Sequence, residues 1–251
     1  PNNTAVEFKD KKLTYLELNQ RANQLAGTLK NNNLRKGSNV PIIANNSINS
    51  LIAVLAVLKT DLTYVPIEAN QPNSRINHII KDCNASIILS DSFFNPKDNI
   101  KNINLSNEDN YNQKENENPL SLANSNNLAC LIYTSGSSGE PKGIKLSHKN
   151  LINQAYYRVK LYNIKNNDIV SQNRPFGFVA SIWIYLAPLF TGSKIIIYPD
   201  DFIKDIKRFL NKVIDDKVTI LTVPATILRV NDNNIKKSID NLFKKSNLKV
   251  L

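Results

Sequence analysis

The sequence predicts an α/β fold in which parallel β-sheets are layered with helices. Short apolar runs typical of buried strands alternate with longer segments whose apolar residues recur at helical spacing. Strands that alternate with helices favour parallel sheets covered by helices, because each crossover between parallel strands needs a long connection. A chain of 251 residues, 41% of them hydrophobic, is long enough to bury a substantial core of this kind.

The first half of the chain begins with a helix whose start is marked in the sequence. Thr14 is the expected N-cap and Glu17 its capping partner, and apolar residues then recur at helical spacing as far as Leu29. The elements expected next are a strand at 40–44, a helix at 47–58, a strand at 64–67, a helix at 74–81 and a strand at 86–89.

The second half opens with a polar excursion. Residues 91–127 are rich in Asn, Asp and Glu, and they predict a long surface connection with one short strand at 100–105. The core resumes at 128–133. The elements expected after it are a helix within 145–162 with Ser147 as its cap, a strand at 168–171, a helix at 181–190, a strand at 194–198, a helix at 201–213 and a strand at 217–223.

A segment rich in glycine and hydroxyl residues follows the apolar run 128–132, and residues 133–143 read YTSGSSGEPKG. Glycine permits backbone conformations that other residues avoid, so amide N–H groups in such a loop can converge on an anion. The hydroxyl groups add donors and the lysine adds positive charge. The alternative is a solvated surface loop. We expect a phosphate-binding loop whose contacts come from Thr134, Ser135, Gly136, Ser137, Ser138, Gly139 and Lys142.

This loop resembles the signature of the adenylate-forming (AMP-binding) superfamily, which includes acyl-CoA synthetases, luciferases and the adenylation domains of nonribosomal peptide synthetases. Three further segments narrow the resemblance to the adenylation domains. They follow the family's order and read LTYLELNQRANQLA at 13–26, LKTDLTYVPI at 58–67 and FVASIW at 178–183. The resemblance therefore extends over most of the chain.

The resemblance implies that residues 1–251 form part of the N-terminal large domain, with the C-terminal small domain absent. The family's adenine-binding segment, metal-binding glutamate, ribose-binding aspartate and catalytic lysine belong to later motifs, beyond this chain. We therefore expect no catalytic residue and no metal ligand within these residues. We also expect the isolated fragment to be inactive or nearly so.

The last of the three segments departs from the family pattern at one position. Where amino-acid adenylation domains carry the aspartate that pairs with the substrate's α-ammonium, this chain has Val179. An unpaired buried ammonium costs several kcal/mol, so a keto, hydroxy or unsubstituted acid fits better, unless the site is degenerate. The expected pocket residues are Phe178, Val179, Ala180, Trp183 and Thr222.

The resemblance implies ATP-dependent activation of a carboxylic acid as an acyl-adenylate. Mg²⁺ would accompany ATP, and the acyl group would pass to the phosphopantetheine thiol of a carrier protein. Two alternatives stay open. One is an acyl-CoA synthetase-type ligase with a different acceptor, and the other is a non-catalytic scaffold module that keeps the fold.

Charge and composition argue against other classes of function. The net charge is +11, yet the lysines are scattered and no nucleic-acid-binding motif is present. No apolar run reaches the length of a membrane span, and no signal peptide is recognisable. Cys83 and Cys130 are too few and too far apart for a disulfide framework or a metal site. We expect a cytoplasmic protein that binds neither nucleic acid nor membrane.

Overall fold

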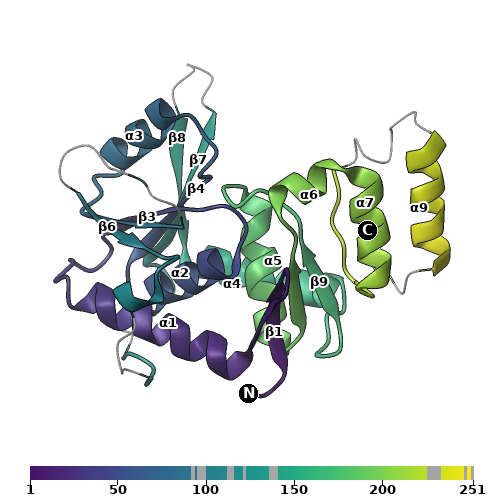
Figure 1. Cartoon of the computed structure of the whole chain (residues 1–251). Helices are drawn as coiled ribbons and strands as arrows, with labels where there is room; N and C mark the ends of the chain where they lie inside the picture. The colour runs from purple at the N-terminus through teal and green to yellow at the C-terminus, as the bar shows by residue number, and fades with distance from the viewer. Residues whose placement is uncertain are drawn as a thin grey trace.

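Two β-sheets organise the chain, and helices pack between them and on their outer faces (Figure 1). The computed structural model describes residues 1–91, 94, 100–111, 116–120, 123–135, 141–224, 233–245 and 248–249. Within these residues, the order of layers is α3, the larger sheet, a central layer of α1, α2, α4 and α5, the smaller sheet, and then α7 with α9. The α/β fold with parallel sheets and covering helices is therefore confirmed.

The larger sheet has six strands in the order β6-β5-β3-β4-β7-β8 among the described residues. The first five run parallel, and β8 pairs antiparallel with β7 at one edge. The strands are β3 (Asn39–Ile43), β4 (Thr63–Ile67), β5 (Ile87–Ser90), β6 (Lys101–Asn104), β7 (Leu128–Ser135) and β8 (Pro141–Ser147).

The smaller sheet has four strands in the order β2-β1-β10-β9 within the described part of the chain. β1, β10 and β9 are parallel, so the N-terminal strand lies beside a strand from far along the sequence. β2 pairs antiparallel with β1. The strands are β1 (Thr4–Phe8), β2 (Lys11–Thr14), β9 (Ile169–Gln172) and β10 (Lys194–Ile197).

Two of the helices begin at the capping residues that the sequence predicts. Thr14 and Glu17 form the predicted capping box at α1, with the Glu17 carboxylate accepting from the Thr14 N–H at 2.7 Å. Ser147 caps α4 in the same way with Asn150. The helices are α1 (Tyr15–Lys30), α2 (Ile48–Lys59), α3 (Asn73–Asp82), α4 (His148–Leu161), α5 (Val179–Thr191), α6 (Asp200–Lys204), α7 (Ile206–Asp215) and α9 (Asn233–Lys245), with a 3-10 turn, η1, at Glu108–Asn110. None of these helices is long and apolar enough to cross a membrane.

The helix expected within 145–162 is confirmed as α4, which begins at His148 after its predicted cap Ser147, and residues 141–147 before it form β8. Two other expectations about the second half are corrected. The helix at 201–213 is two helices, because the Asp205 side chain accepts from the Arg208 N–H and starts α7. The strand at 217–223 is a single bridge between Val170 and Ile220. Its ladder stops there because the Thr219 hydroxyl accepts the Ile169 N–H and so competes with backbone pairing.

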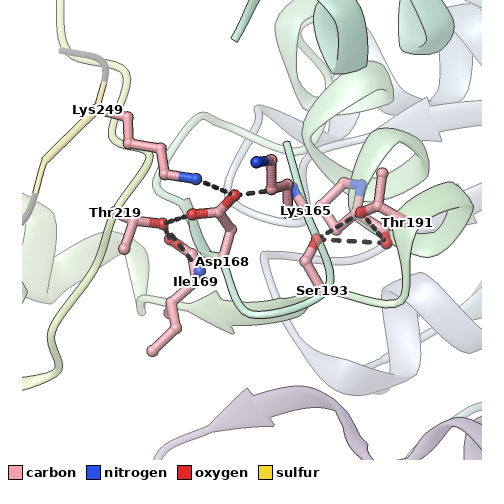
Figure 2. Close-up of polar contacts among 8 residues, drawn as sticks. Lys165, Asp168, Ile169, Thr191, Ser193, Thr219 and Lys249 are labelled. Atoms are coloured by element: carbon pink, nitrogen blue, oxygen red, sulfur yellow. Dashed lines mark hydrogen bonds and ion pairs between the residues drawn. The ribbon is translucent and has the colours of Figure 1, made fainter. Parts of the chain in front are cut away.

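The strand β9 is preceded by a buried carboxylate that ties three segments together (Figure 2). Asp168 accepts hydrogen bonds from the Lys249 ammonium at 2.7 Å, the Thr219 hydroxyl at 2.8 Å and the Lys165 N–H at 2.8 Å. Burial alone would raise the pKa of Asp168, but these hydrogen bonds outweigh it and hold the pKa below its usual value. The carboxylate therefore joins residue 249 and the segment after α7 to the smaller sheet.

Asp168→Asn keeps the shape of this side chain and removes its charge. We expect the free energy of unfolding to fall by about 2 kcal/mol, because charge-assisted hydrogen bonds to a buried acceptor are lost. Urea unfolding followed by circular dichroism measures the change. Glu108→Gln is the matched control, since it weakens the exposed ion pair with Arg21 and should cost less than about 1 kcal/mol. Equal losses in the two variants would contradict the role of Asp168.

The same group gives a pH dependence with a defined sign. Because the pKa of Asp168 is lowered in the folded chain, its contribution is complete above the ordinary aspartate pKa of about 3.9 and is lost as pH falls through the lower folded value. In that acid window the wild-type chain should lose more stability than Asp168→Asn.

Candidate functional site

The glycine-rich segment is the connection of an antiparallel hairpin at the edge of the larger sheet. β7 ends at Ser135 and β8 begins at Pro141, and Thr134 lies opposite Lys142 in the register. Thr134 and Lys142 are exposed, which leaves a hydroxyl and an ammonium side by side at the mouth of the loop. The predicted residues Gly136, Ser137, Ser138 and Gly139, and the side chain of Ser135, lie outside the described residues.

The base of this hairpin is fixed by close packing at a glycine. A Cβ atom on Gly143 would lie 2.9 Å from Leu131 Cδ1 and 3.3 Å from the Tyr133 ring. The Tyr133 hydroxyl donates to the Asp82 carboxylate at the end of α3, and burial raises the pKa of Tyr133 well above its usual value. The hairpin is therefore anchored to α3 at its base.

The FVASIW segment forms the start of α5. Phe178 is the N-cap residue and makes no side-chain cap hydrogen bond, and Val179 is the first residue of the helix. The Ser181 hydroxyl donates to the carbonyls of Phe176 and Phe178, at 2.9 and 2.7 Å, and so holds the turn into the helix. Phe178 and Val179 are 59% and 58% exposed, so neither serves the apolar core.

A buried asparagine joins this turn to the ends of three strands. The Asn46 amide donates to the Arg174 carbonyl and to the Asp200 carboxylate, both at 2.8 Å. Its oxygen accepts from the Gln172 amide at 3.1 Å and from the Tyr185 hydroxyl at 3.3 Å. These residues follow β3, β9 and β10 or lie on α5, so one side chain links the carboxyl ends of strands from both sheets. Sequence reasoning missed Asn46, whose only signal in the sequence is its place three residues after the end of β3.

Two carboxyl groups near this turn are harder to ionise than usual. Burial raises the pKa of Glu68, and the neighbouring Asp200 carboxylate raises it further, while a hydrogen bond with the Gly177 backbone opposes the change. Burial likewise raises the pKa of Asp200. A Cβ atom on Gly177 would lie 3.2 Å from Glu68 Oε1, so the glycine allows this close contact.

The five predicted pocket residues are distributed over different surroundings. Trp183 is buried, with the Arg158 guanidinium 5.3 Å from its ring and the Tyr162 ring 5.7 Å away. Ala180 is half-buried on α5. Thr222 accepts the Asn173 amide at its carbonyl, and its buried hydroxyl has no partner among the described residues. Val179 instead lines a groove between α4 and α5. Their shared pocket stays a prediction.

The groups at the mouth of the loop suit the phosphates of ATP, and the described residues offer less to Mg²⁺. Thr134 and Lys142 offer an exposed donor and an exposed cation at the loop, which suits a phosphate. No group of three or more His, Cys, Asp or Glu among the described residues could hold a metal ion.

The comparisons place the chain in a family. The family model described as "AMP-binding enzyme" matches residues 1–248, and the chain belongs to that family. It is 34% identical to gramicidin S synthase 1 of Brevibacillus brevis over 90% of this chain and 21% of the relative. It is also 32% identical to tyrocidine synthase 3 of Brevibacillus parabrevis, over 90% of this chain and 4% of the relative. The chain therefore spans only a small part of these relatives.

Solved structures support the same fold. The N-terminal subdomain of NpsA from Klebsiella oxytoca superposes with a TM-score of 0.77 at 28% identity, over 87% of this chain and 56% of that one. The nonribosomal peptide synthetase FmoA3, solved in an AMPPNP-bound form, gives a TM-score of 0.83 at 21% identity, over 94% of this chain and 26% of that one. The resemblance to nonribosomal peptide synthetase adenylation domains is thus confirmed.

The packing at Gly143 can be tested by adding one methyl group. We expect Gly143→Ala to lower the free energy of unfolding by about 1–2 kcal/mol, because the added Cβ forces the buried Leu131 side chain to move. Thermal unfolding measures the change. Lys145→Ala, an exposed position on the same strand, should stay within about 0.5 kcal/mol of the wild type. A neutral Gly143→Ala would show that the base of the hairpin is loosely packed.

Proposed function

We propose that the protein activates a carboxylic acid with ATP. A carboxylate oxygen of the acid attacks the α-phosphorus, the bond to the pyrophosphate oxygen breaks, and acyl-AMP and pyrophosphate form. The observation that carries this proposal is the glycine-rich hairpin loop, with Thr134 and Lys142 paired at its mouth, in a chain of the AMP-binding enzyme family. The reaction needs two anions held in line and charge neutralised, so no nucleophilic side chain is required.

The loop would hold the phosphates that leave. The hydroxyl groups and backbone N–H groups of residues 134–139 supply donors, and Lys142 supplies positive charge against the β- and γ-phosphates. The Tyr133–Asp82 hydrogen bond and the packing at Gly143 support the loop from below. Mg²⁺ would neutralise phosphate charge when it binds with ATP, and among the described residues no cluster of His, Cys, Asp or Glu would hold it.

The acid that we propose lacks an α-ammonium group. Val179 carries no charge, and the nearest raised-pKa carboxyl groups do not replace the missing aspartate. Burial raises the pKa of Glu68, whose carboxyl group is hydrogen-bonded to the Gly177 backbone, and Asp200 accepts the Asn46 amide. An ammonium beside Val179 would thus lack an effective counter-charge. A keto, hydroxy or unsubstituted acid is supported, and Phe178, Ala180, Trp183 and Thr222 would form the other walls.

The acceptor that we propose is the phosphopantetheine thiol of a carrier protein, because the relatives are peptide synthetases. An acyl-CoA synthetase-type ligase is the second candidate, and a non-catalytic scaffold is the third, supported only by Val179. We also propose that residues 1–251 alone catalyse little, because they correspond to a small part of the relatives' length. The activity assays below therefore use the protein at its full natural length.

The acid class is tested by ATP–pyrophosphate exchange. The panel pairs α-amino acids with their α-keto and α-hydroxy analogues, and adds simple aryl and fatty acids. We expect exchange with acids that lack the ammonium and none with amino acids. Val179→Asp should reverse the preference by about tenfold or more, because it restores a counter-charge. Exchange of the wild type with amino acids would keep the enzyme class and reject the role of Val179. No exchange with any acid in a folded protein would favour the scaffold.

The loop lysine is tested separately. Lys142→Ala should weaken ATP binding about 10- to 100-fold, since a charge-assisted hydrogen bond to phosphate contributes roughly 1.5–3 kcal/mol. Lys145→Ala is the matched control, because residue 145 is exposed on the same strand and points to the opposite face. Calorimetric titration with a non-hydrolysable ATP analogue gives the affinities. Similar losses in both variants would indicate a general effect of surface charge.

A further inference from the structure

We propose that a pocket on the outer face of the smaller sheet binds a small organic anion with a flat apolar body and a carboxylate or phosphate head group. The helices α6 and α7 cover this face (Figure 1). The volume of the pocket is about 320 Å³, within the range of pockets that hold small molecules. Its lining residues come from segments 7–9, 196–202 and 208–216, rather than from the glycine-rich loop or α5. The inference therefore goes beyond the proposed function and does not depend on it.

The alternation of side chains places this pocket on the opposite side of the smaller sheet from α5. Ile196 and Tyr198, at the end of β10 and directly after it, share one face and pack with Phe209 of α7. Ile195 and Ile197 face the other way, into the core that contains α5. A ligand in the pocket would therefore be separated from α5 by the sheet itself.

Two of the acidic groups that line the pocket are already neutralised. Glu7 of β1 accepts from the Lys194 ammonium at 3.3 Å. Asp216, at the end of α7, accepts from the Tyr198 hydroxyl at 2.8 Å and from the Lys212 ammonium at 2.6 Å. Both carboxylates thus have donors within the protein, and they offer little to a cationic ligand.

Two of the cations in the lining have no acidic partner within the described residues. The Arg208 guanidinium lies 4.5 Å from the Phe202 ring centroid, and the Lys9 ammonium lies 5.3 Å from the Phe8 ring centroid. Asp201, the third acid of the lining, is exposed and also forms no ion pair with the described residues. Two free positive charges therefore face one free negative charge, and an anion is the ligand that this balance favours.

An aromatic wall holds the Arg208 guanidinium in place for such a ligand. The Phe202 and Tyr198 rings are stacked, with centroids 6.2 Å apart, and Tyr198 packs edge-to-face against Phe209. A guanidinium that lies over a ring keeps N–H groups free at its edge, where they match two oxygens of a carboxylate or phosphate. The rings and Pro199 supply apolar surface for the body of the ligand.

Calorimetric titration of the protein at its full natural length tests the site. The main probe is phenylphosphonate, which carries no carboxyl group and is therefore no substrate for acid activation. Benzylamine and benzyl alcohol are its cationic and neutral counterparts. We expect phenylphosphonate to bind at least about tenfold more tightly than either of them. Comparison with benzoate, the carboxylate counterpart, identifies the preferred head group.

Four variants locate the binding of phenylphosphonate. Arg208→Gln should weaken it at least about tenfold, because the two-pronged donor is lost. Lys9→Gln is a second lining variant with the same expected direction. Lys207→Gln is the matched control, since residue 207 is exposed beside Arg208 and does not line the pocket, and it should leave the affinity unchanged. Lys142→Ala should leave the affinity unchanged as well, which separates this site from the glycine-rich loop.

Several results would overturn the proposal. An unchanged affinity in Arg208→Gln, or equal losses in Arg208→Gln and Lys207→Gln, would show that the guanidinium forms no specific site. Benzylamine binding as tightly as phenylphosphonate would reject the preference for an anion. Loss of binding in Lys142→Ala would place the probe at the glycine-rich loop instead.

Discussion

The arrangement of the site depends on one buried polar side chain at the junction of the two sheets. Asn46 is 2% exposed and uses both amide hydrogens and its oxygen. A buried asparagine that is fully hydrogen-bonded is tolerated, but removing it would leave the side-chain NH₂ group of Gln172 without a partner, at about 1–3 kcal/mol for an unsatisfied buried group. The Tyr185 hydroxyl would keep its hydrogen bond with Ser50. Asn46 also donates to the Arg174 carbonyl, in the segment that leads into α5. A residue that follows β3, far away in sequence, therefore helps to fix the direction in which the chain enters α5.

The glycine-rich loop between β7 and β8 is supported by other contacts. β8 is an antiparallel edge strand, and its position depends on cross-strand contacts with β7 and on the Tyr133–Asp82 hydrogen bond to α3. The loop therefore belongs to the larger sheet, whereas α5 packs on the smaller one. Asn46 connects these two halves, since it lies at the end of β3 and bonds to residues around β9 and β10. The position of the glycine-rich loop relative to the start of α5 therefore depends on how the two sheets are joined.

Periodicity and capping predicted the layered fold and several element boundaries, because Thr14–Glu17 and the apolar runs act locally. The strands at 4–8 and 11–14 were not predicted, because both are short and the second has a single buried residue, Leu13. The strand expected at 217–223 failed because the Thr219 hydroxyl takes an N–H that a ladder would use. The role of Asn46 could not be predicted from sequence alone, because its partners lie more than 120 residues away.

The valine at the start of α5 has no explanation in the stability of the helix. A helix N-terminus favours acidic residues in its first turn by roughly 0.3–1 kcal/mol, yet α5 has none there, and Phe178 provides no side-chain cap. Val179 is 58% exposed, so it adds little to the core. Both the helix dipole and burial would thus accept an aspartate at this position at least as well. The proposed acid without an α-ammonium group would explain the valine, because such a ligand needs no negative charge at residue 179.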